Sequence, residues 1–292
     1  MVKLHIKRGD ESLFLYDTST RIAMEELLHE LVALSNAREQ VLRLSEEILD
    51  LAKHGVAMAP NMQGLTEEQI AELKLEDEWA ARCQPSGGSR LNPDPQGRRS
   101  GQAPSDKLSS VLTRTAEEAK EKVSKKQAAA NICLTMEEVT QCLDQLRGST
   151  MIVYPMGLPP HEPIRMELEQ KIEEAVAGKQ ASKLILEEST AQLWWAGKEM
   201  MRGKKLHDYV GKNEKTKIIA KLQRKGQGAP GREPVVSEQE QKHMMAYAYR
   251  RQEELKKLEE AKDDSYMSSD WADPNSLKRA FQGVSNVSWK PR

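Results

Sequence analysis

Six histidines and three cysteines are the side chains of this 292-residue chain that most readily bind metals or act as nucleophiles. Metal and redox sites hold such residues at short spacings, as in CxxC or HExxH. Here the histidines stand singly, and Cys83, Cys133 and Cys142 form no CxxC pair. The phosphate-binding pattern GxxxxGK[ST] and the hydrolase pattern GxSxG are also missing. We therefore expect no catalytic residue, metal or cofactor, and an enzyme whose site forms only on folding is the weakest of three functional hypotheses.

Trp194 and Trp195 are the first candidate residues for binding another protein. Neighbouring residues of a strand point to opposite faces of a sheet, so one indole can enter the core while the other faces outward. An exposed Trp is a typical anchor of a protein interface. The alternative is that the rest of the chain covers both rings, and the sequence leaves that alternative open.

A basic segment follows the two tryptophans. Residues 198–225 contain ten Lys or Arg against three acidic residues, which favours an acidic protein partner. RNA is disfavoured because no row of aromatic side chains offers a stacking platform, and a merely solvated basic face is the plain alternative. The candidate contact residues in this segment are Lys204, Lys205, Tyr209, Lys212, Lys215 and Lys217.

The C-terminal part adds a charged helix and a tail. Residues 238–262 have the pattern of a helix whose apolar positions are too sparse for a coiled coil. In the tail, Trp271 and Trp289 stand in an otherwise polar stretch. Aromatic side chains in such tails are often anchors, so we count both as candidate contacts and favour docking on the same chain over docking on a partner.

The composition limits the class of protein. The chain has 44 Lys and Arg against 45 Asp and Glu, a net charge of -1, with 30% charged and 4% aromatic residues. Near-zero net charge argues against bulk electrostatic binding to nucleic acid. No apolar run approaches the ~18 residues that crossing a membrane requires, and the N-terminus lacks the apolar stretch of a signal peptide. We expect a soluble intracellular protein with a compact part and solvated helices.

The first 55 residues have the pattern of a hairpin and a long helix. Val2, Leu4 and Ile6 alternate with polar residues, a turn follows at 8–11, and a second apolar run indicates the returning strand. Leucines then recur at helical spacing, which predicts one long helix, or two in series, ending near Gly55.

The middle of the chain is mostly helical in pattern. Pro85–Pro104 is rich in Gly, Pro and Ser, which predicts a loop or linker. Thr135 and Glu138 have the spacing of a capping box, which predicts a helix start. Thr150–Tyr154 is a short run of residues typical of strands.

Residues 193–226 resemble the C-terminal half of ubiquitin: an apolar strand, an Ala-Gly-Lys turn, a Leu-x-Asp-Tyr loop and a last strand with a basic tail. The resemblance implies a ubiquitin-like β-grasp domain whose first strand pairs with the last strand near Ile218. An ungapped match would bury Lys217 and Lys221, which is costly for unpaired charges. We therefore expect a one-residue slip that turns Ile218, Ala220 and Leu222 inward. The tail lacks a terminal Gly-Gly, so this fold is expected to make contacts rather than to be conjugated.

These segments predict an α+β fold in three parts. A discontinuous β-grasp domain takes residues 1–36 and 187–228. A mainly helical insertion takes residues 37–186, with its Gly/Pro-rich loop at 85–104. A charged helix and tail take residues 229–292.

Longer segments resemble the Kurly family of cilia- and flagella-associated proteins nearly end to end. They include MVKLHIKRGDES, TMIVYPMGLPP, QLWWAGKE, DYVGKNEKTKIIAKLQ and the ending Trp289–Arg292. The resemblance implies a protein needed for motile cilia, through assembly of axonemal dynein arms, with a link to planar cell polarity and cilium placement. It carries over no catalytic residue.

The leading hypothesis is therefore a non-enzymatic adaptor for cytoplasmic assembly of outer dynein arms. Its expected partners are dynein-arm subunits, assembly factors and chaperones, with no nucleic acid and no membrane insertion. The alternative is a resident axonemal protein that docks dynein or tubulin. The expected locations are the cytoplasm, the cilium or flagellum, and the basal body.

Overall fold

A computed structural model describes most of the chain. Met1–Glu233 forms one compact unit and Pro234–Arg292 a second, and each is described by itself. The described residues are 1–65, 67–75, 77–79, 82–169, 184–231, 238–260, 275, 278–279 and 281–283. Two predicted contact residues, Trp271 and Trp289, therefore lie outside the described residues. None of the described helices is both long enough and apolar enough to cross a membrane.

One five-stranded sheet joins the beginning and the end of the first unit. Its order is β2-β1-β7-β5-β6, with β1 parallel to β7 and the other neighbours antiparallel. The strands are β1 (Val2–Arg8), β2 (Glu11–Thr18), β5 (Ala191–Trp195), β6 (Lys198–Glu199) and β7 (Lys217–Arg224). With a helix packed on one face, this is the strand arrangement of a β-grasp fold. The predicted α+β class is confirmed, and Leu4 lies opposite Ile218 as expected.

The register of β7 confirms the predicted slip. Ile218, Ala220 and Leu222 are buried in the core. Lys217 and Ile219 point to the opposite face and are exposed, as the two-residue period of a strand requires. One lysine of that outer face, Lys221, is nevertheless buried, and its partners are described with the candidate site.

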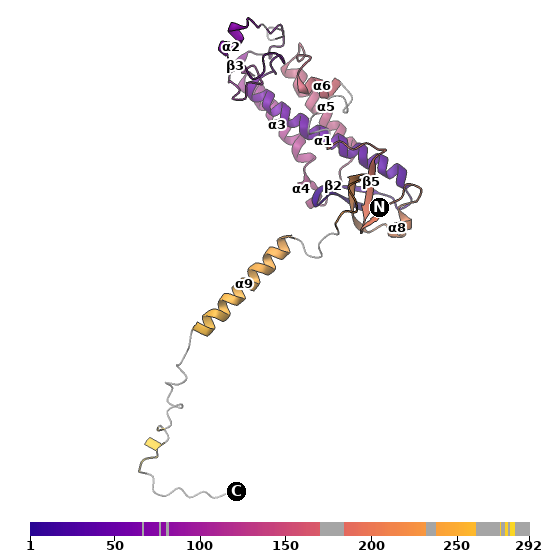
Figure 1. The fold of residues 1–292 in the computed structure, drawn as a ribbon, viewed down its shortest axis with the longest axis vertical. Helices are drawn as coiled ribbons and strands as arrows, with labels where there is room; N and C mark the ends of the chain where they lie inside the picture. The colour runs from indigo at the N-terminus through magenta and orange to yellow at the C-terminus, as the bar shows by residue number, and fades with distance from the viewer. Residues whose placement is uncertain are drawn as a thin grey trace. The chain divides into compact units, whose positions relative to one another are not determined.

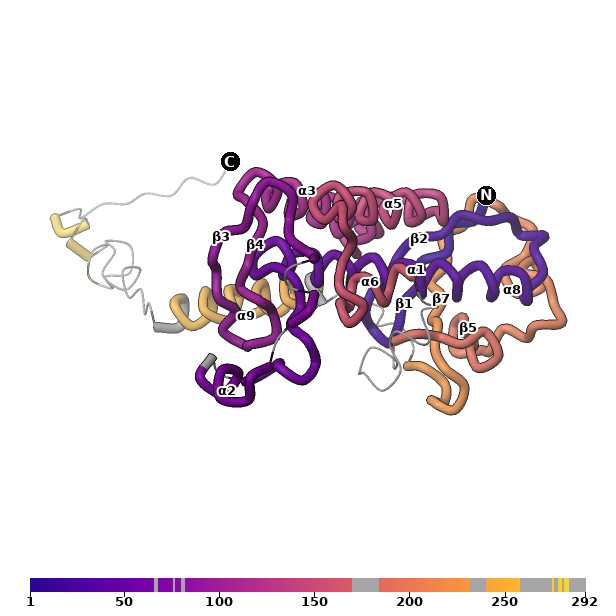
Figure 2. Tube along the Cα trace, turned by 90° about the horizontal axis from the view of Figure 1, so that it is seen from above, coloured from indigo at the N-terminus to yellow at the C-terminus, as the bar shows by residue number. Residues whose placement is uncertain are grey.

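A single long helix, α1 (Met24–His54), organises the unit. Its apolar stripe is buried along the whole length, from Leu27 to Leu51. One end packs against the inner face of the sheet, and the other end packs against the helices that follow (Figure 2). The helix ends at His54 with Gly55 as its C-cap, so the structure selects one long helix over two in series and confirms the predicted end near Gly55.

The segment predicted as an insertion packs on the second half of α1. Its helices are α2 (Glu67–Glu72), α3 (Asp106–Lys122), α4 (Lys125–Ala129), α5 (Met136–Val153) and α6 (Pro163–Glu169). Because α1 runs without a break past residue 36, the predicted boundary falls inside a helix. Leu4 of the sheet and Leu112 of α3 belong to one continuous hydrophobic core.

Two local predictions in this segment have different outcomes. The capping box is confirmed: Glu138 N–H donates to Thr135 Oγ1 at 3.3 Å, and Thr135 N–H donates to the Glu138 carboxylate at 3.1 Å. The prediction of a strand at Thr150–Tyr154 is wrong, since α5 continues to Val153. A well-capped helix whose inner face, including Leu146, is buried against the core outweighs the β preference of a few residues.

The Gly/Pro-rich loop is ordered. β3 (Ser89–Leu91) and β4 (Gln102–Pro104) pair as a short antiparallel hairpin. Between them, the Asp94 carboxylate accepts backbone N–H groups of Gln96, Arg98 and Arg99 at 3.0 to 3.2 Å. These bonds close the loop locally and lower the pKa of Asp94, against the opposing effect of its burial.

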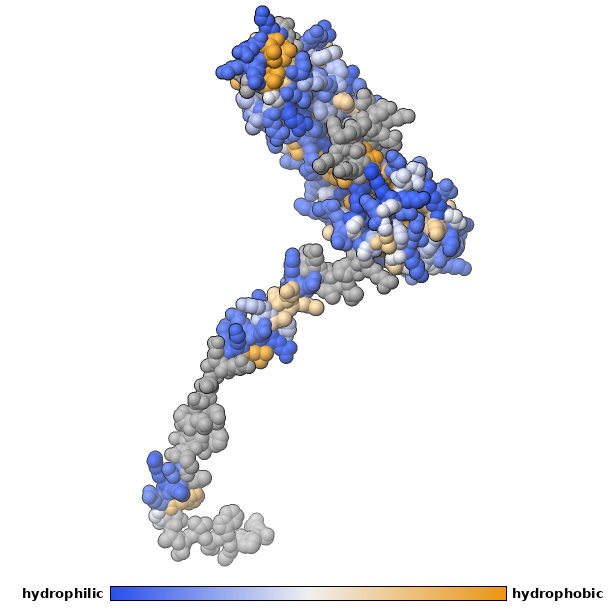
Figure 3. Space-filling view, viewed as in Figure 1, coloured by the Kyte–Doolittle hydropathy of each residue, from blue (hydrophilic) through white to orange (hydrophobic). Residues whose placement is uncertain are grey.

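Two further helices of the described residues are the short α8 (His207–Val210), which follows β6 and precedes β7 in the chain, and α9 (Glu238–Glu260) in the second unit (Figure 1). Every side chain of α9 described between residues 240 and 257 is exposed, including Met245 and Tyr249. The surface drawn in Figure 3 is mostly hydrophilic, as the high content of charged residues predicts.

Candidate protein-contact groove

Trp194 and Trp195 lie on opposite faces of β5. Trp195 shares its face with the buried residues Ala191 and Leu193, and it packs against the hydrophobic core. Trp194 lies on the outer face, directly opposite Lys221 of β7. Both rings are partly buried, so their different surroundings, rather than their accessible areas, distinguish them.

A groove of about 510 Å³ opens on the outer face beside Trp194. Its lining includes Trp194 and Trp195, together with Ile219 of β7 and Pro230, which follows that strand. We call it the outer groove, and its lining residues are Trp194, Trp195, Ala196, Gly197, Ile219, Lys221, Pro230 and Gly231. Aromatic and aliphatic walls of this kind are typical of sites that bind other molecules.

Within the part of the chain that the structure describes, the segment at Cys133 and Leu134 covers the β2 side of the outer face. Leu15 of β2 lies opposite the outward His5, yet it is fully buried. The reason is that the strand-like segment at Cys133 and Leu134 runs beside β2, with Leu134 N–H donating to the Leu15 carbonyl at 2.8 Å. The side formed by β7 and β5 retains the outer groove.

Lys221 is buried because it has polar partners. Its Nζ lies 3.3 Å from an Asp10 carboxylate oxygen and donates to the Gly231 carbonyl at 2.9 Å. Asp10 belongs to the turn between β1 and β2, so one ammonium group ties that hairpin to the chain beyond β7. The cost of burying a charge is offset by these bonds.

Residues Gly226–Gly231, which we call the strap, fold back over the outer face of β7. Gln223, like Lys221, donates its side-chain N–H to a strap carbonyl, that of Gly228. The glycines at 226, 228 and 231 have the GxGxxG spacing of a dinucleotide-binding turn. That turn must lead from a strand directly into a helix, whereas the strap returns over its own sheet, so we assign it no nucleotide.

The predicted residues Lys204 and Lys205 lie beside the N-terminus of α1, just before α8, and Tyr209 lies in α8 itself. Lys204 Nζ lies 5.5 Å from the centre of the Tyr209 ring. The Tyr209 hydroxyl accepts the Met201 N–H at 2.8 Å, and its ring packs against the core. Met24 N–H donates to the Lys204 carbonyl, which supplies an acceptor for one free N–H of the helix start.

The predicted residues Lys212, Lys215 and Lys217 are exposed at the entry to β7. Lys217 lies opposite Lys3 of β1, and each ammonium group is 3.4 Å from an oxygen of Asn131. The structure thus places the predicted residues in three separate sets, of which only the tryptophans line the outer groove. Ile219 and Pro230 were missed; strand alternation places Ile219 outward, but no sequence signal places Pro230 near Trp194.

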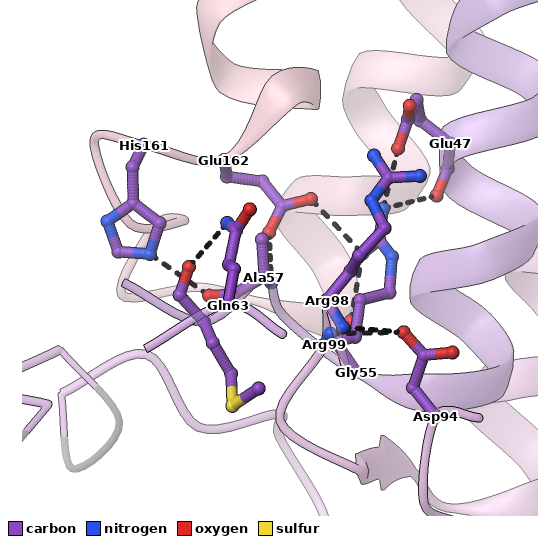
Figure 4. Close-up of polar contacts among 10 residues, drawn as sticks. Glu47, Gly55, Ala57, Gln63, Asp94, Arg98, Arg99, His161 and Glu162 are labelled. Carbon is purple, nitrogen blue, oxygen red and sulfur yellow. Dashed lines mark hydrogen bonds and ion pairs between the residues drawn. The ribbon is translucent and has the colours of Figure 1, made fainter. Parts of the chain in front are cut away.

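A second polar feature lies at the far end of α1 and binds the Gly/Pro-rich loop to the helices. Arg99 is buried and lies 3.2 Å from the Glu162 carboxylate and 2.7 Å from the Glu47 carboxylate (Figure 4). It also donates to the Gly55 carbonyl at 2.9 Å. The second Glu162 oxygen accepts the Ala57 N–H at 2.6 Å.

Glu162 is fully buried, and its environment acts on its pKa in two directions. Burial disfavours the charged form and raises the pKa, while Arg99 and the Ala57 N–H act against that rise. All the partners are groups of the chain itself, so we interpret this cluster as structural. Among the residues that the structure describes, no group of three or more His, Cys, Asp or Glu side chains is placed to hold a metal ion.

The fold is that of an α+β protein, and a groove opens on the outer face of its sheet. The chain is 59% identical to cilia- and flagella-associated protein 298-A of Xenopus laevis, with all of both chains covered. It is 59% identical to protein 298 of Danio rerio and 57% identical to that of Homo sapiens, again over both full lengths. The family model of cilia- and flagella-associated protein 298 matches residues 191–287. The chain belongs to the cilia- and flagella-associated protein 298 family. No solved structure gives a significant match.

Proposed function

We propose that the chain is a non-enzymatic adaptor that supports cytoplasmic assembly of outer dynein arms for motile cilia. The observation that carries the proposal is full-length similarity to cilia- and flagella-associated relatives. The dynein-arm role comes from the resemblance to the Kurly family, as does a further role in cilium positioning and planar cell polarity. Its partners are dynein-arm subunits, assembly factors or chaperones, and it acts in the cytoplasm and at the cilium, flagellum or basal body.

The outer groove is the contact surface that we assign to this adaptor. On the β-grasp sheet it lies on the face opposite α1, where Trp194 and Ile219 face outward. A partly buried Trp beside an aliphatic side chain has the features of an interface centre, and exposed lysines at the entry to β7 favour an acidic partner.

The second candidate is a resident axonemal protein that docks dynein or tubulin. The exposed lysines Lys212, Lys215 and Lys217 favour it, because tubulin tails are acidic. Fractionation of cilia from cell bodies separates the two candidates. A salt-resistant axonemal pool supports the resident protein, and a pool confined to cell bodies supports the assembly adaptor.

Truncating the two tryptophans separately is expected to give different defects. Trp195→Ala removes a ring packed on the core and lowers stability by roughly 3 kcal/mol. Trp194→Ala removes an outward ring and weakens partner binding by about thirtyfold with little change in melting temperature. The measurements are thermal unfolding of each purified variant and quantitative capture of dynein-arm subunits from ciliating cells.

Trp79→Ala serves as the matched control, because Trp79 lies in the helical segment and its ring contacts Arg82 rather than the outer groove. It is expected to capture the same subunits as the wild type. Loss of stability in both Trp194→Ala and Trp195→Ala would show that both rings belong to the hydrophobic core. Normal capture by a folded Trp194→Ala protein would remove the outer groove from the proposed function.

A further inference from the structure

The strap shows what kind of segment the outer face of β7 accepts. It is a stretch of turns and bends with three glycines and one proline, and it is held by its backbone carbonyls. Lys221 and Gln223 donate their side-chain N–H groups to the carbonyls of Gly231 and Gly228. Pro230 lines the same groove as the Trp194 ring. The surface therefore combines donors for peptide carbonyls with an aromatic wall for a proline ring.

One donor on this face has no acceptor. The Trp194 indole N–H is buried and meets no hydrogen-bond partner among the described residues. A buried donor without a partner is destabilising, and a carbonyl placed against it would remove that cost. Pro230 and Gly231 of the strap line the groove beside this N–H. A small outward shift of the strap would therefore let an extended peptide segment reach it.

The charged side chains beside the outer groove indicate which residues should stand next to the proline of a bound segment. Lys217 stands two residues before Ile219 and on the same face of β7, and Lys3 lies directly opposite Lys217. Both ammonium groups contact only neutral oxygens of Asn131 in the interactions that the structure gives them. A segment bound along β7 therefore meets lysines next to the apolar part of the groove.

We propose that the outer groove binds an extended, proline-containing peptide segment with acidic residues beside the proline. The proline packs between Trp194, Ile219 and Pro230, a backbone carbonyl accepts the Trp194 N–H, and the acidic side chains reach Lys217 and Lys3. Proline-rich segments favour the extended polyproline II conformation, which lowers the entropy lost on docking to an aromatic groove. This proposal rests on the proposed function and names the chemistry of its partner.

The test is a fluorescence anisotropy titration of the full chain with labelled synthetic peptides. The probe is the twelve-residue peptide (Glu-Pro-Pro)4, and its controls are (Glu-Gly-Ser)4, with the same charge but no proline, and (Lys-Pro-Pro)4, with the opposite charge. We expect saturable binding of the first peptide and at least ~10-fold weaker binding of each control.

Two variants locate the site. Trp194→Phe keeps an aromatic wall but removes the N–H, and we expect about 3-fold to 10-fold weaker binding of the probe, the loss of one hydrogen bond. Trp79→Phe, far from the groove lining, is expected to bind normally. Equal binding of (Glu-Gly-Ser)4, unchanged binding by Trp194→Phe, or no saturable binding would each overturn the proposal.

Failure of this proposal is distinguishable from failure of the proposed function. If the probe does not bind but Trp194→Ala still loses dynein-arm subunits, the contact surface stands and its partner has another chemistry. If the probe binds at Trp194 but an excess of it leaves capture of those subunits unchanged, the groove has the proposed ligand class and serves another partner.

Discussion

Gly55→Ala is expected to lose roughly 3–5 kcal/mol of stability, which corresponds to a fall in melting temperature of about 6–20 °C. Gly55 ends α1 at φ 77° and ψ -163°, a backbone region that is essentially restricted to glycine. A Cβ there would lie 2.1 Å from the Gln102 carbonyl oxygen and 2.7 Å from its carbon. Backbone atoms cannot yield as a flexible side chain can, so β4 would have to move away from α1.

Gly211→Ala is the matched control for this prediction. Gly211 also ends a helix, at φ 86° and ψ -175°, but a Cβ there meets nothing within 4 Å. The control therefore pays only the backbone strain, of order 1–3 kcal/mol. Thermal and urea unfolding of the two variants measures the difference, which we expect to be at least ~2 kcal/mol. Equal losses would mean that the close approach to Gln102 has no energetic consequence.

Arg99→Met is expected to destabilise the protein by about 3–5 kcal/mol at pH 8, because Glu162 keeps its buried position and loses its cation. The double variant Arg99→Met with Glu162→Gln removes both charges and keeps an acceptor for the Ala57 N–H. We expect the double variant to recover most of the lost stability, since a neutral buried pair has no unpaired charge. Urea unfolding of the single and double variants measures the free energy of unfolding of each, and hence the coupling between Arg99 and Glu162.

Lowering the pH should rescue Arg99→Met. Burial already raises the pKa of Glu162 in the folded protein, and loss of Arg99 removes a group that opposes the rise. The folded state then binds the proton more tightly than the unfolded state, so stability increases as the pH falls through the raised pKa of the folded carboxyl towards the pKa of the unfolded one. Between pH 8 and pH 5, Arg99→Met should gain stability relative to the double variant. If the stability of Arg99→Met and that of the double variant changed with pH in parallel, the loss could not be assigned to an unpaired Glu162 carboxylate.

Local patterns of the sequence were sufficient to predict several of the helices and strands. Alternation predicts β1, the leucine spacing predicts α1 up to Gly55, and the Thr135 capping box predicts the start of α5. Each of these signals operates within one turn or one strand, where hydrogen bonds and side-chain spacing act between near neighbours. Thr150–Tyr154 misleads for the same reason, because its β preference is local and the burial of α5 is not.

The candidate groove was predictable only in part. Adjacency on a strand places Trp194 and Trp195 on opposite faces, but it cannot tell which face is inner. That depends on the pairing of β5 with β7, whose register puts Trp194 opposite Lys221 and on the outer face. The strap is less predictable still, because its position follows from the hydrogen bonds of Lys221 and Gln223. Lysine and glutamine are residue types that usually lie exposed to solvent.

By itself the sequence determined the class of fold, the long central helix, the register of the last strand and, through its similarity to relatives, the family. The tertiary structure alone decided which tryptophan faces outward and how the Gly/Pro-rich loop is held. In that loop Arg99 pairs with Glu162, 63 residues further along the chain. Such a pair leaves no periodic signal, because its energy comes from the attraction between two charges that only the fold brings together in a place with little water.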